Sequence, residues 1–239
     1  MKKVLLAIPA FNEEKNIGLV LNDLLASDKE FDILVINDGS KDRTESIVRK
    51  MGVDIVNLPF NLGYGSALQT GYKYAVLKNY DYLITYDADY QHRAEDLNTV
   101  YDMLIEDKYD IILGSRFLNK DIKPDFLKRI AYLLFKNLVF ILTKKKITDP
   151  TSGFQGLNRK AFSFYSKMDN YSPDFPDADI LIMVLWAGYR IKEVPIGVRK
   201  RPTGTSMHNG IKPLIYFVKV FLSILIIIFR NRIMGRRKK

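Results

Sequence analysis

The first 115 residues alternate between short apolar runs and segments in which apolar residues recur every three or four positions. The runs predict five strands, over residues 4–8, 33–36, 54–58, 82–86 and 111–113. The intervening segments predict helices over residues 13–27 and 97–105, one through Ile47 and Val48, and one that ends at Lys78. Short buried strands between helices are typical of a largely parallel sheet with both faces covered. We therefore expect an α/β fold.

The carboxyl-terminal half carries two apolar segments next to basic residues. Residues 126–143 place Lys128, Arg129 and Lys136 opposite one apolar side. That apolar side consists of Leu127, Ile130, Leu133, Leu134, Leu138 and Ile141. The pattern predicts an amphipathic helix, suited to a membrane interface or to core packing.

Residues 214–229 form the second apolar segment, which is 16 residues long and contains Lys219. A spanning helix needs about 20 apolar residues. We therefore expect a helix that lies in the membrane interface or docks on a membrane protein.

Composition narrows the class of protein. The 239 residues suit one catalytic region, which we place at residues 1–210, followed by a membrane-associating segment at 211–239. The 47% hydrophobic content excludes a disordered chain, and the lack of cysteine excludes disulfides and thiolate metal sites. The apolar run near the amino terminus is too short for a signal peptide.

The net charge of +10 calls for an anionic partner. Basic residues gather at the end of the chain, directly after the second apolar segment: Arg230, Arg232, Arg236, Arg237, Lys238 and Lys239. Basic residues beside an apolar helix favour anionic lipid headgroups over nucleic acid, although a solvated tail after a core helix gives the same pattern. We expect peripheral attachment to the cytoplasmic face of the cell membrane.

Four polar clusters follow the predicted strands, at residues 9–13, 37–40, 61–65 and 87–89. In open α/β sheets ligands bind beyond the carboxyl ends of the strands. We therefore expect the four clusters to open on one rim of the sheet.

The cluster at residues 87–89 suggests a metal site. Asp87 and Asp89 are two positions apart, so in an extended segment both side chains point to one side. Their oxygens suit Mg²⁺ or Mn²⁺, and Gln91 repeats the spacing. His92 is a ligand or, alternatively, a cap or surface histidine. A strand-end turn gives the same Asp-Ala-Asp pattern without a metal.

Gly63 and Gly65 precede a helix whose first turn includes Ser66, where backbone N–H groups can face a pyrophosphate. The segment is neither a Walker loop nor a dinucleotide-binding fingerprint. Kinase and dehydrogenase functions therefore lose their main support.

Six motifs in one order resemble glycosyltransferase family 2, and within it the branch of dolichyl- and polyprenyl-phosphate sugar transferases. The motifs are Pro9-Ala10-Phe11-Asn12-Glu13, Asn37-Asp38-Gly39-Ser40, Asn61-Leu62-Gly63-Tyr64-Gly65, Asp87-Ala88-Asp89-Tyr90-Gln91-His92, Gly114-Ser115-Arg116 and Asp149-Pro150-Thr151-Ser152-Gly153-Phe154. Each motif is weak alone, but the ordered set is specific and spans residues 3–206. The resemblance implies a GT-A type, Rossmann-like fold, a nucleotide-diphosphate-sugar donor such as a UDP- or GDP-hexose, and inversion at the anomeric carbon.

The resemblance also implies roles for individual residues. Nucleotide-sugar binding falls to Pro9, Phe11, Asn12, Glu13, Asp38, Gly65, Asp87 and Ala88, and the metal to Asp87, Asp89 and Gln91. Arg116 and Arg129 face the acceptor phosphate, and Arg199 and the loop ending at Ser206 close over the diphosphate. Asp89 and Arg116 are catalytic. Arginines at helix starts, however, often bond only carbonyls or carboxylates.

Two features depart from the family pattern. Relatives of this branch often carry clear spanning helices after the catalytic domain, where this chain has only residues 214–229. Residues 175–179 also differ, and counting back from Gly188 puts Asp177 where hydroxyl-directed relatives keep their catalytic base. An N-cap for a helix over residues 180–186 is the alternative reading of Asp177.

The function expected from the sequence is transfer of a hexose to a polyprenyl (undecaprenyl-type) phosphate during cell-surface glycan assembly. An alternative is transfer to a hydroxyl of a lipid-linked or cell-wall glycan, with Asp177 as catalytic base. A catalytically silent membrane-binding module is a third, against which the intact Asp87-Ala88-Asp89 argues. A membrane protein or a second copy of the chain are further candidate partners, and nucleic acid is not.

Overall fold

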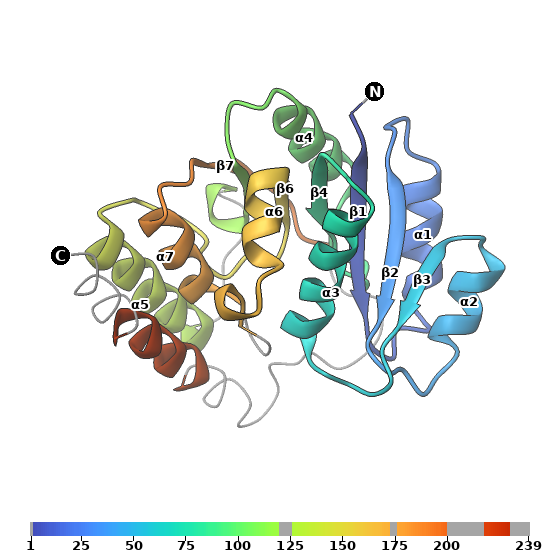
Figure 1. Cartoon of the computed structure of the whole chain (residues 1–239), viewed down its shortest axis with the longest axis horizontal. Helices are drawn as coiled ribbons and strands as arrows, with labels where there is room; N and C mark the ends of the chain where they lie inside the picture. The colour runs from blue at the N-terminus through green and yellow to red at the C-terminus, as the bar shows by residue number, and fades with distance from the viewer. Residues whose placement is uncertain (1, 120–125, 173–175, 200–217, 230–239) are drawn as a thin grey trace.

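The computed structural model describes residues 2–119, 126–172, 176–199 and 218–229. Its centre is a seven-stranded sheet in the order β3-β2-β1-β4-β6-β5-β7 (Figure 1). The strands are β1 (Val4–Ala10), β2 (Asp32–Asn37), β3 (Asp54–Asn57), β4 (Tyr82–Thr85), β5 (Ile111–Ser115), β6 (Gln155–Asn158) and β7 (Ile191–Pro195).

Most neighbouring strands run parallel, which confirms the expected largely parallel sheet. β1 pairs in parallel with β2 and β4, β2 with β3, and β5 with β7. β6 is the exception, since it runs antiparallel to both β4 and β5. The sequence did not predict β6 or β7. β6 is short and contains Gly156, and β7 carries Lys192 and Glu193, so neither reads as an apolar run.

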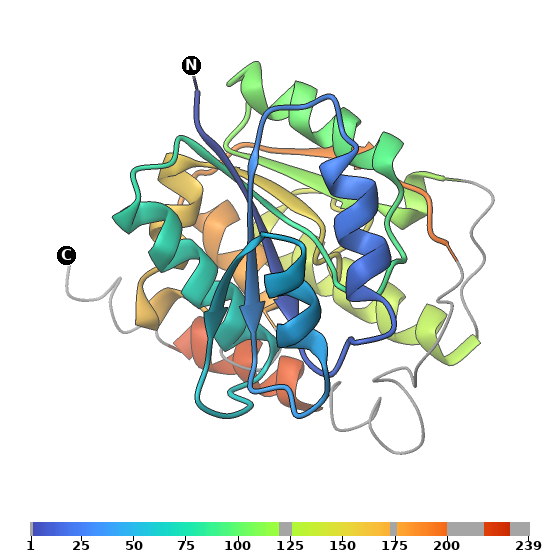
Figure 2. The same cartoon turned by 90° about the vertical axis from the view of Figure 1, so that its right-hand side faces the viewer.

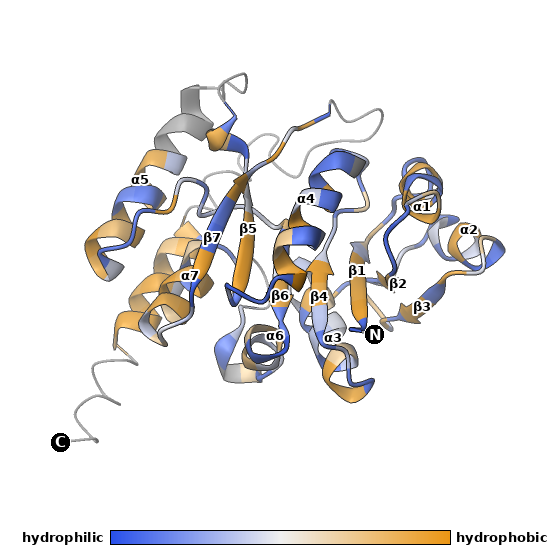
Figure 3. Cartoon of the chain, turned by 90° about the horizontal axis from the view of Figure 1, so that it is seen from above, coloured by the Kyte–Doolittle hydropathy of each residue, from blue (hydrophilic) through white to orange (hydrophobic). Residues whose placement is uncertain are grey.

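Eight α-helices are described with the sheet. They are α1 (Ile17–Leu25), α2 (Thr44–Lys50), α3 (Tyr64–Leu77), α4 (Ala94–Ile105), α5 (Phe126–Thr143), α6 (Arg159–Tyr165), α7 (Ala178–Trp186) and a helix over residues 218–229. Helices α1, α2 and α4 cover one face of the sheet, and α3 and α6 cover the other (Figure 3). Figure 2 looks onto the β3 edge, where α1 and α2 lie beside the strands.

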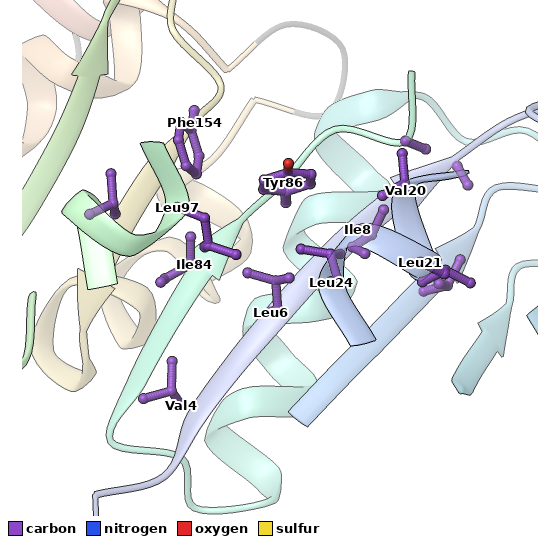
Figure 4. Packing of buried hydrophobic residues seen from close by; sticks show 14 of the residues in the cluster. Val4, Leu6, Ile8, Val20, Leu21, Leu24, Ile84, Tyr86, Leu97 and Phe154 are labelled. Atoms are coloured by element: carbon purple, nitrogen blue, oxygen red, sulfur yellow. The ribbon is translucent and has the colours of Figure 1, made fainter. Parts of the chain in front are cut away.

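Alternation along β1 builds the two layers of core. Val4, Leu6 and Ile8 pack with α1 and α4 (Figure 4), whereas Leu5 and Ala7 pack with α3. β1 continues through Pro9 and ends at Ala10, two residues past the predicted end. β4 pairs only with Val4–Ala7, so one side of β1 has no strand at Pro9, where a missing N–H is tolerated.

A third apolar cluster joins β5, α5, α7 and the helix over residues 218–229. Phe135 and Val139 of α5 are buried in it with Val220 and Ile224. The apolar side expected for α5 is therefore divided. Leu138 packs against this cluster, while Leu133, Leu134 and Ile141 are exposed. Within the described ranges, no helix has both the length and the apolarity needed to cross a membrane.

Candidate active site

The clusters after β1 and β2 lie together at the carboxyl end of the sheet, as predicted. The register pairs Ala10 with Asn37, so the two loops leave the sheet side by side. Asn12 has a positive φ of 55°, its N–H donates to Ser40 Oγ at 2.9 Å, and its side-chain oxygen accepts the N–H of Lys41 at 2.9 Å. The N–H of Glu13 donates to Thr44 Oγ1 at 2.9 Å. These bonds preform the loop that contains the expected nucleotide-binding residues.

Asp38 brings the third cluster to the same rim. Its two carboxylate oxygens accept the N–H groups of Leu62 at 2.7 Å and Gly63 at 3.0 Å. Gly39 makes this approach possible, since a Cβ there would lie 2.5 Å from the carbonyl carbon of Phe60. The Gly63 N–H is thus occupied by Asp38. That backbone N–H groups in the first turn of α3 face a pyrophosphate stays a prediction. Gly65 lies buried in the first turn of α3.

The Asp87-Ala88-Asp89 cluster follows β4 but is not extended. β4 ends at Thr85, residues 88 and 89 form a turn, and Tyr90 has a positive φ of 65°. The argument that both aspartates point to one side of an extended segment is therefore wrong. Asp89 Oδ1 accepts the N–H of Gln91 at 3.1 Å, which stabilises the turn.

Two side chains hold Asp87. Tyr64 donates its hydroxyl to Asp87 Oδ1 at 3.0 Å, and His92 Nε2 lies 3.0 Å from Oδ2. The His92 ring is buried between Phe154 and Tyr86, with ring centroids 4.5 and 5.1 Å away. His92 is therefore neither a cap nor a surface residue but a partner of Asp87.

The surroundings favour the ionised form of Asp87. Burial alone would raise the pKa of its carboxyl, but the hydrogen bond and charge of His92, followed by the Tyr64 hydroxyl, lower that pKa below its usual value. Its side chain stays 34% exposed, so the carboxylate can still reach a ligand.

A divalent metal fits this arrangement if the substrate completes its coordination. In the part of the chain that is described, no group of three or more His, Cys, Asp or Glu residues is placed to hold a metal ion. Mg²⁺ is commonly bound through one or two carboxylates, with substrate phosphates and water filling the other positions. Asp87, held from two sides, and the nearby Asp89 form such a partial set.

Gln91 and Arg199 are joined to each other. The N–H of Arg199 donates to the Gln91 carbonyl at 2.8 Å, and Gln91 Nε2 lies 3.4 Å from the Arg199 carbonyl. The Arg199 side chain pairs with Asp23 Oδ2 of α1 at 2.9 Å and lies over the ring of Tyr90. Arg199 thus reaches the turn after β4. Ser206 and the side chain of Arg129 lie outside the described residues.

Arg116 is anchored by a buried carboxylate. It begins a short 3-10 helix (Arg116–Leu118), and its Nε and Nη2 bind Asp149 Oδ2 and Oδ1 at 2.7 and 2.9 Å. Asp149 is fully buried, while 36% of the Arg116 side chain is exposed. Burial alone would lower the pKa of Arg116, but Asp149 raises it above its usual value, with smaller contributions from Asp177 and Asp87. Arg116 makes the carboxylate contact that the alternative reading expects, and its acceptor role stays a prediction.

Asp177 occupies the N-cap position of α7, but its side chain makes no cap hydrogen bond. Asp179 serves instead, because its Oδ1 accepts the N–H groups of Asp177 at 3.0 Å and Ile180 at 2.8 Å. Asp177 is therefore the N-cap residue by position, as the alternative reading expects, but its side chain does not make the cap bond. Burial raises the pKa of Tyr64, and the charges of Asp87 and Asp177 raise it further. Asp177 thus lies within electrostatic reach of both Tyr64 and Arg116.

Three supporting residues escaped the sequence analysis, namely Tyr64, Asp149 and Asp179. Tyr64 and Asp149 belong to two of the six family motifs, so their place in those motifs could have identified them. Asp179 had none, since its partners are backbone groups and Ser223.

Comparisons with known proteins agree with this geometry. The sequence profile described as Glycosyl transferase family 2 matches residues 6–165. The UDP-N-acetylglucosamine–dolichyl-phosphate N-acetylglucosaminyltransferase of Methanococcus voltae is 30% identical over 245 residues, which cover 95% of this chain and 96% of that protein. The dolichyl-phosphate hexose transferase of Haloferax volcanii is 30% identical over 198 residues, covering 82% of this chain and 83% of that protein.

A solved structure supports the fold. Glucosyl-3-phosphoglycerate synthase from Mycobacterium tuberculosis, in complex with Mn²⁺, UDP and glucosyl-3-phosphoglycerate, superposes with a TM-score of 0.72 at 17% identity. The match covers 95% of this chain and 80% of that structure. The expected GT-A-like α/β fold is thereby confirmed. With this fold, the motifs gathered on one rim and a profile that matches most of its length, the chain belongs to glycosyl transferase family 2.

Proposed function

We propose that this protein is an inverting glycosyltransferase that moves a hexose from a nucleotide-diphosphate sugar to a polyprenyl phosphate. The observation that carries the proposal is the pairing of charges on this rim. Arg116 is anchored by Asp149, and the charge of Asp87 contributes to the raised pKa of Arg116. Relatives named as dolichyl-phosphate sugar transferases, about as long as this chain, support the acceptor class.

The donor binds on the rim formed by the loops after β1, β2 and β4. Asp87 and Asp89 would hold the divalent metal, Mg²⁺ or Mn²⁺, and Gln91 is a further candidate ligand. The related structure named above contains Mn²⁺ and UDP, which supports this choice. When bound, the metal supplies positive charge next to the departing diphosphate.

The protein's own residues stabilise the charge that develops during transfer. Tyr64 and His92 keep Asp87 ionised and oriented, and Asp149 keeps the Arg116 guanidinium fixed. Groups that are already in place when charge develops stabilise the transition state more than the ground state. A phosphate acceptor is already an anion, so the reaction needs positioning and positive charge rather than a strong base.

A second candidate function is transfer to a hydroxyl, with Asp177 as base. The charge of Asp177, which contributes to the raised pKa values of Arg116 and Tyr64, favours this reading. A base contributes about 10²–10⁴-fold to such a reaction. For a phosphate acceptor, Asp177→Asn should retain turnover within about tenfold, whereas a hydroxyl acceptor should make it fall several hundredfold.

We also propose peripheral membrane attachment through the carboxyl-terminal helix and tail. The helix over residues 218–229 exposes Leu222 and Ile226, and the basic residues of the tail follow it. Charged substitutions at these two positions should weaken sedimentation with anionic liposomes. Unchanged sedimentation of a doubly substituted chain would place the membrane contact elsewhere.

The direct test offers the full chain membranes and a panel of labelled nucleotide sugars, followed by lipid extraction. A labelled lipid that is cleaved by mild acid identifies a glycosyl phosphate and supports the proposal. Label in an acid-stable lipid or polysaccharide would move the acceptor to a hydroxyl. No transfer from any donor would favour the silent module.

A further inference from the structure

Asp179 is a buried carboxylate that the proposed chemistry does not use. The residue is 1% exposed, and its Oδ1 accepts the N–H groups of Asp177 and Ile180. Its other oxygen, Oδ2, accepts the hydroxyl of Ser223. Burial raises the pKa of this carboxyl, and its hydrogen bonds only partly oppose the rise. Burying a carboxyl group costs free energy, so we expect Asp179 to have a role that offsets this cost.

Ser223 comes from the helix over residues 218–229, more than forty positions away in sequence. That helix lies along α5 and α7 (Figure 1). Its inner side is formed by Val220, Ile224 and Ile227, which are buried, and Ser223 shares this side at helical spacing. The Ser223 hydroxyl is therefore directed into the apolar contact with α7.

Apolar packing alone would hold this helix but would not fix its position along α7. Apolar contacts are non-directional, so neighbouring registers bury similar areas. The partly buried hydrogen bond between Ser223 and Asp179 forms in one register and leaves unpaired polar groups in the others. The polar pair therefore specifies where the helix docks.

The same carboxylate also holds the start of α7. Asp179 Oδ1 binds the N–H of Asp177, whose charge acts on Arg116 and Tyr64 at the rim. Two consecutive hydrogen bonds thus connect the carboxyl-terminal helix to the backbone of Asp177. The chain runs from the Ser223 hydroxyl through the Asp179 carboxylate to the Asp177 backbone.

We propose that Asp179 and Ser223 are positioning residues, through which docking of the carboxyl-terminal helix sets the placement of Asp177 at the start of α7. The helix is then part of the active-site architecture and not only a membrane contact. The inference rests on the proposed function for its catalytic consequence. The structural link itself can be tested without any activity.

The first test measures amide exchange. In Ser223→Ala, the Asp177 and Ile180 amides should exchange with solvent about tenfold faster, because Asp179 loses a bond that orients it. Ser223→Thr keeps the hydroxyl and should restore slow exchange. Ser46→Ala makes the same chemical change at an exposed position on α2 and serves as the matched control. Equal exchange of both amides in Ser223→Ala and in the unmodified chain would overturn the proposal, whatever the activity.

The second test measures kinetics of the full chain with a lipid phosphate acceptor in detergent. Ser223→Ala should lower kcat about threefold, within the limit set for Asp177→Asn, with the donor KM unchanged, and Ser223→Thr should recover most of the loss. A rise in donor KM at constant kcat would contradict a role on the acceptor side. If the unmodified chain shows no transfer, the proposed function fails, while the exchange measurement still decides the structural link.

Discussion

The two ends of the sheet build their parts of the site in different ways. On the side of β1, β2 and β3, each motif follows its own strand, and the loops are tied together by bonds between backbone N–H groups and short polar side chains. On the side of β5, β6 and β7, the supporting groups are instead buried carboxylates. Arg116 needs Asp149, and Asp179 binds Ser223.

This difference teaches where the molecule is tolerant to change. A loop held by many backbone contacts keeps its shape when one side chain is lost, because the remaining contacts persist. Arg116 is held by one buried carboxylate and by the hydroxyl and carbonyl of Thr151, so loss of Asp149 removes its anionic partner. Substitutions on the side of β1, β2 and β3 should therefore affect turnover first, and substitutions on the side of β5, β6 and β7 should affect turnover and stability together.

The largest effect on turnover is expected for Asp89→Ala, in the turn after β4. Loss of this carboxylate should reduce turnover on the order of 10²–10³-fold, because it would hold the metal ion whose positive charge stabilises the departing diphosphate. The unfolding midpoint should stay near that of the unmodified chain. Initial rates with Mn²⁺, Mg²⁺ and excess EDTA make the measurement, and the exposed Asp28→Ala is the control. Full activity of Asp89→Ala in EDTA would exclude a metal site at this turn.

On the side of β5, β6 and β7, Arg116→Ala leaves Asp149 buried without its cationic partner. Removing one member of a buried ion pair costs roughly 3–5 kcal/mol, so the free energy of unfolding should fall by about 3 kcal/mol, given that Arg116 is partly exposed. Urea titration makes the measurement.

Two controls sharpen that result. Arg43→Ala removes an arginine from an exposed pair with Glu14 and should leave the urea midpoint unchanged. The double substitution Arg116→Met with Asp149→Leu removes both charges and should recover much of the lost stability. Equal losses for Arg116→Ala and Arg43→Ala would erase the contrast between the two sides.

Gly153→Ala tests the point at which the two sides meet. A Cβ at this position would lie 2.5 Å from the Tyr64 hydroxyl oxygen and 4.0 Å from Asp87 Oδ1, so the hydroxyl must move. Loss of a supporting partner should weaken Mn²⁺ binding in the presence of UDP by about tenfold. Isothermal titration measures this. Gly18→Ala, whose Cβ meets only Ile47 Cγ2 at 3.6 Å, should leave binding unchanged.

The smallest effect is expected for Asp110, which joins β5 to β6 and to the start of β7. Burial alone would raise the pKa of Asp110, but the N–H and guanidinium of Arg190 and the amide of Asn158 lower it below its usual value. A lowered folded-state pKa means that its stabilising contribution is present above the unfolded pKa and is lost as pH falls through the folded pKa.

Asp110→Asn should therefore lower stability at neutral pH by about 1–2 kcal/mol and flatten the loss of stability in acid. Urea midpoints between about pH 3 and pH 7 test this, because this range spans the unfolded carboxyl pKa. Parallel curves for the two proteins would show that Asp110 contributes no pH-dependent stability.

The sequence alone determined the first half of the fold and the identity of the rim. Strands β1 to β5 and the helices between them carry their periodicity locally, because each buries its own apolar face. Parallel pairing then brings the clusters after β1, β2 and β4 to one edge, which follows from strand order and needs no detailed packing. The sequence alone therefore places Asn12, Asp38 and Asp87 on this rim.

Only the tertiary structure decided the second half and the support of the site. β6 and β7 are strands because neighbouring strands complete their hydrogen bonds, and Lys192 and Glu193 hide the pattern that would predict β7. The contacts of Arg116 with Asp149 and of Asp179 with Ser223 join residues more than thirty positions apart. No local periodicity encodes such a pair, because each partner is stabilised by a group that only the folded chain brings near.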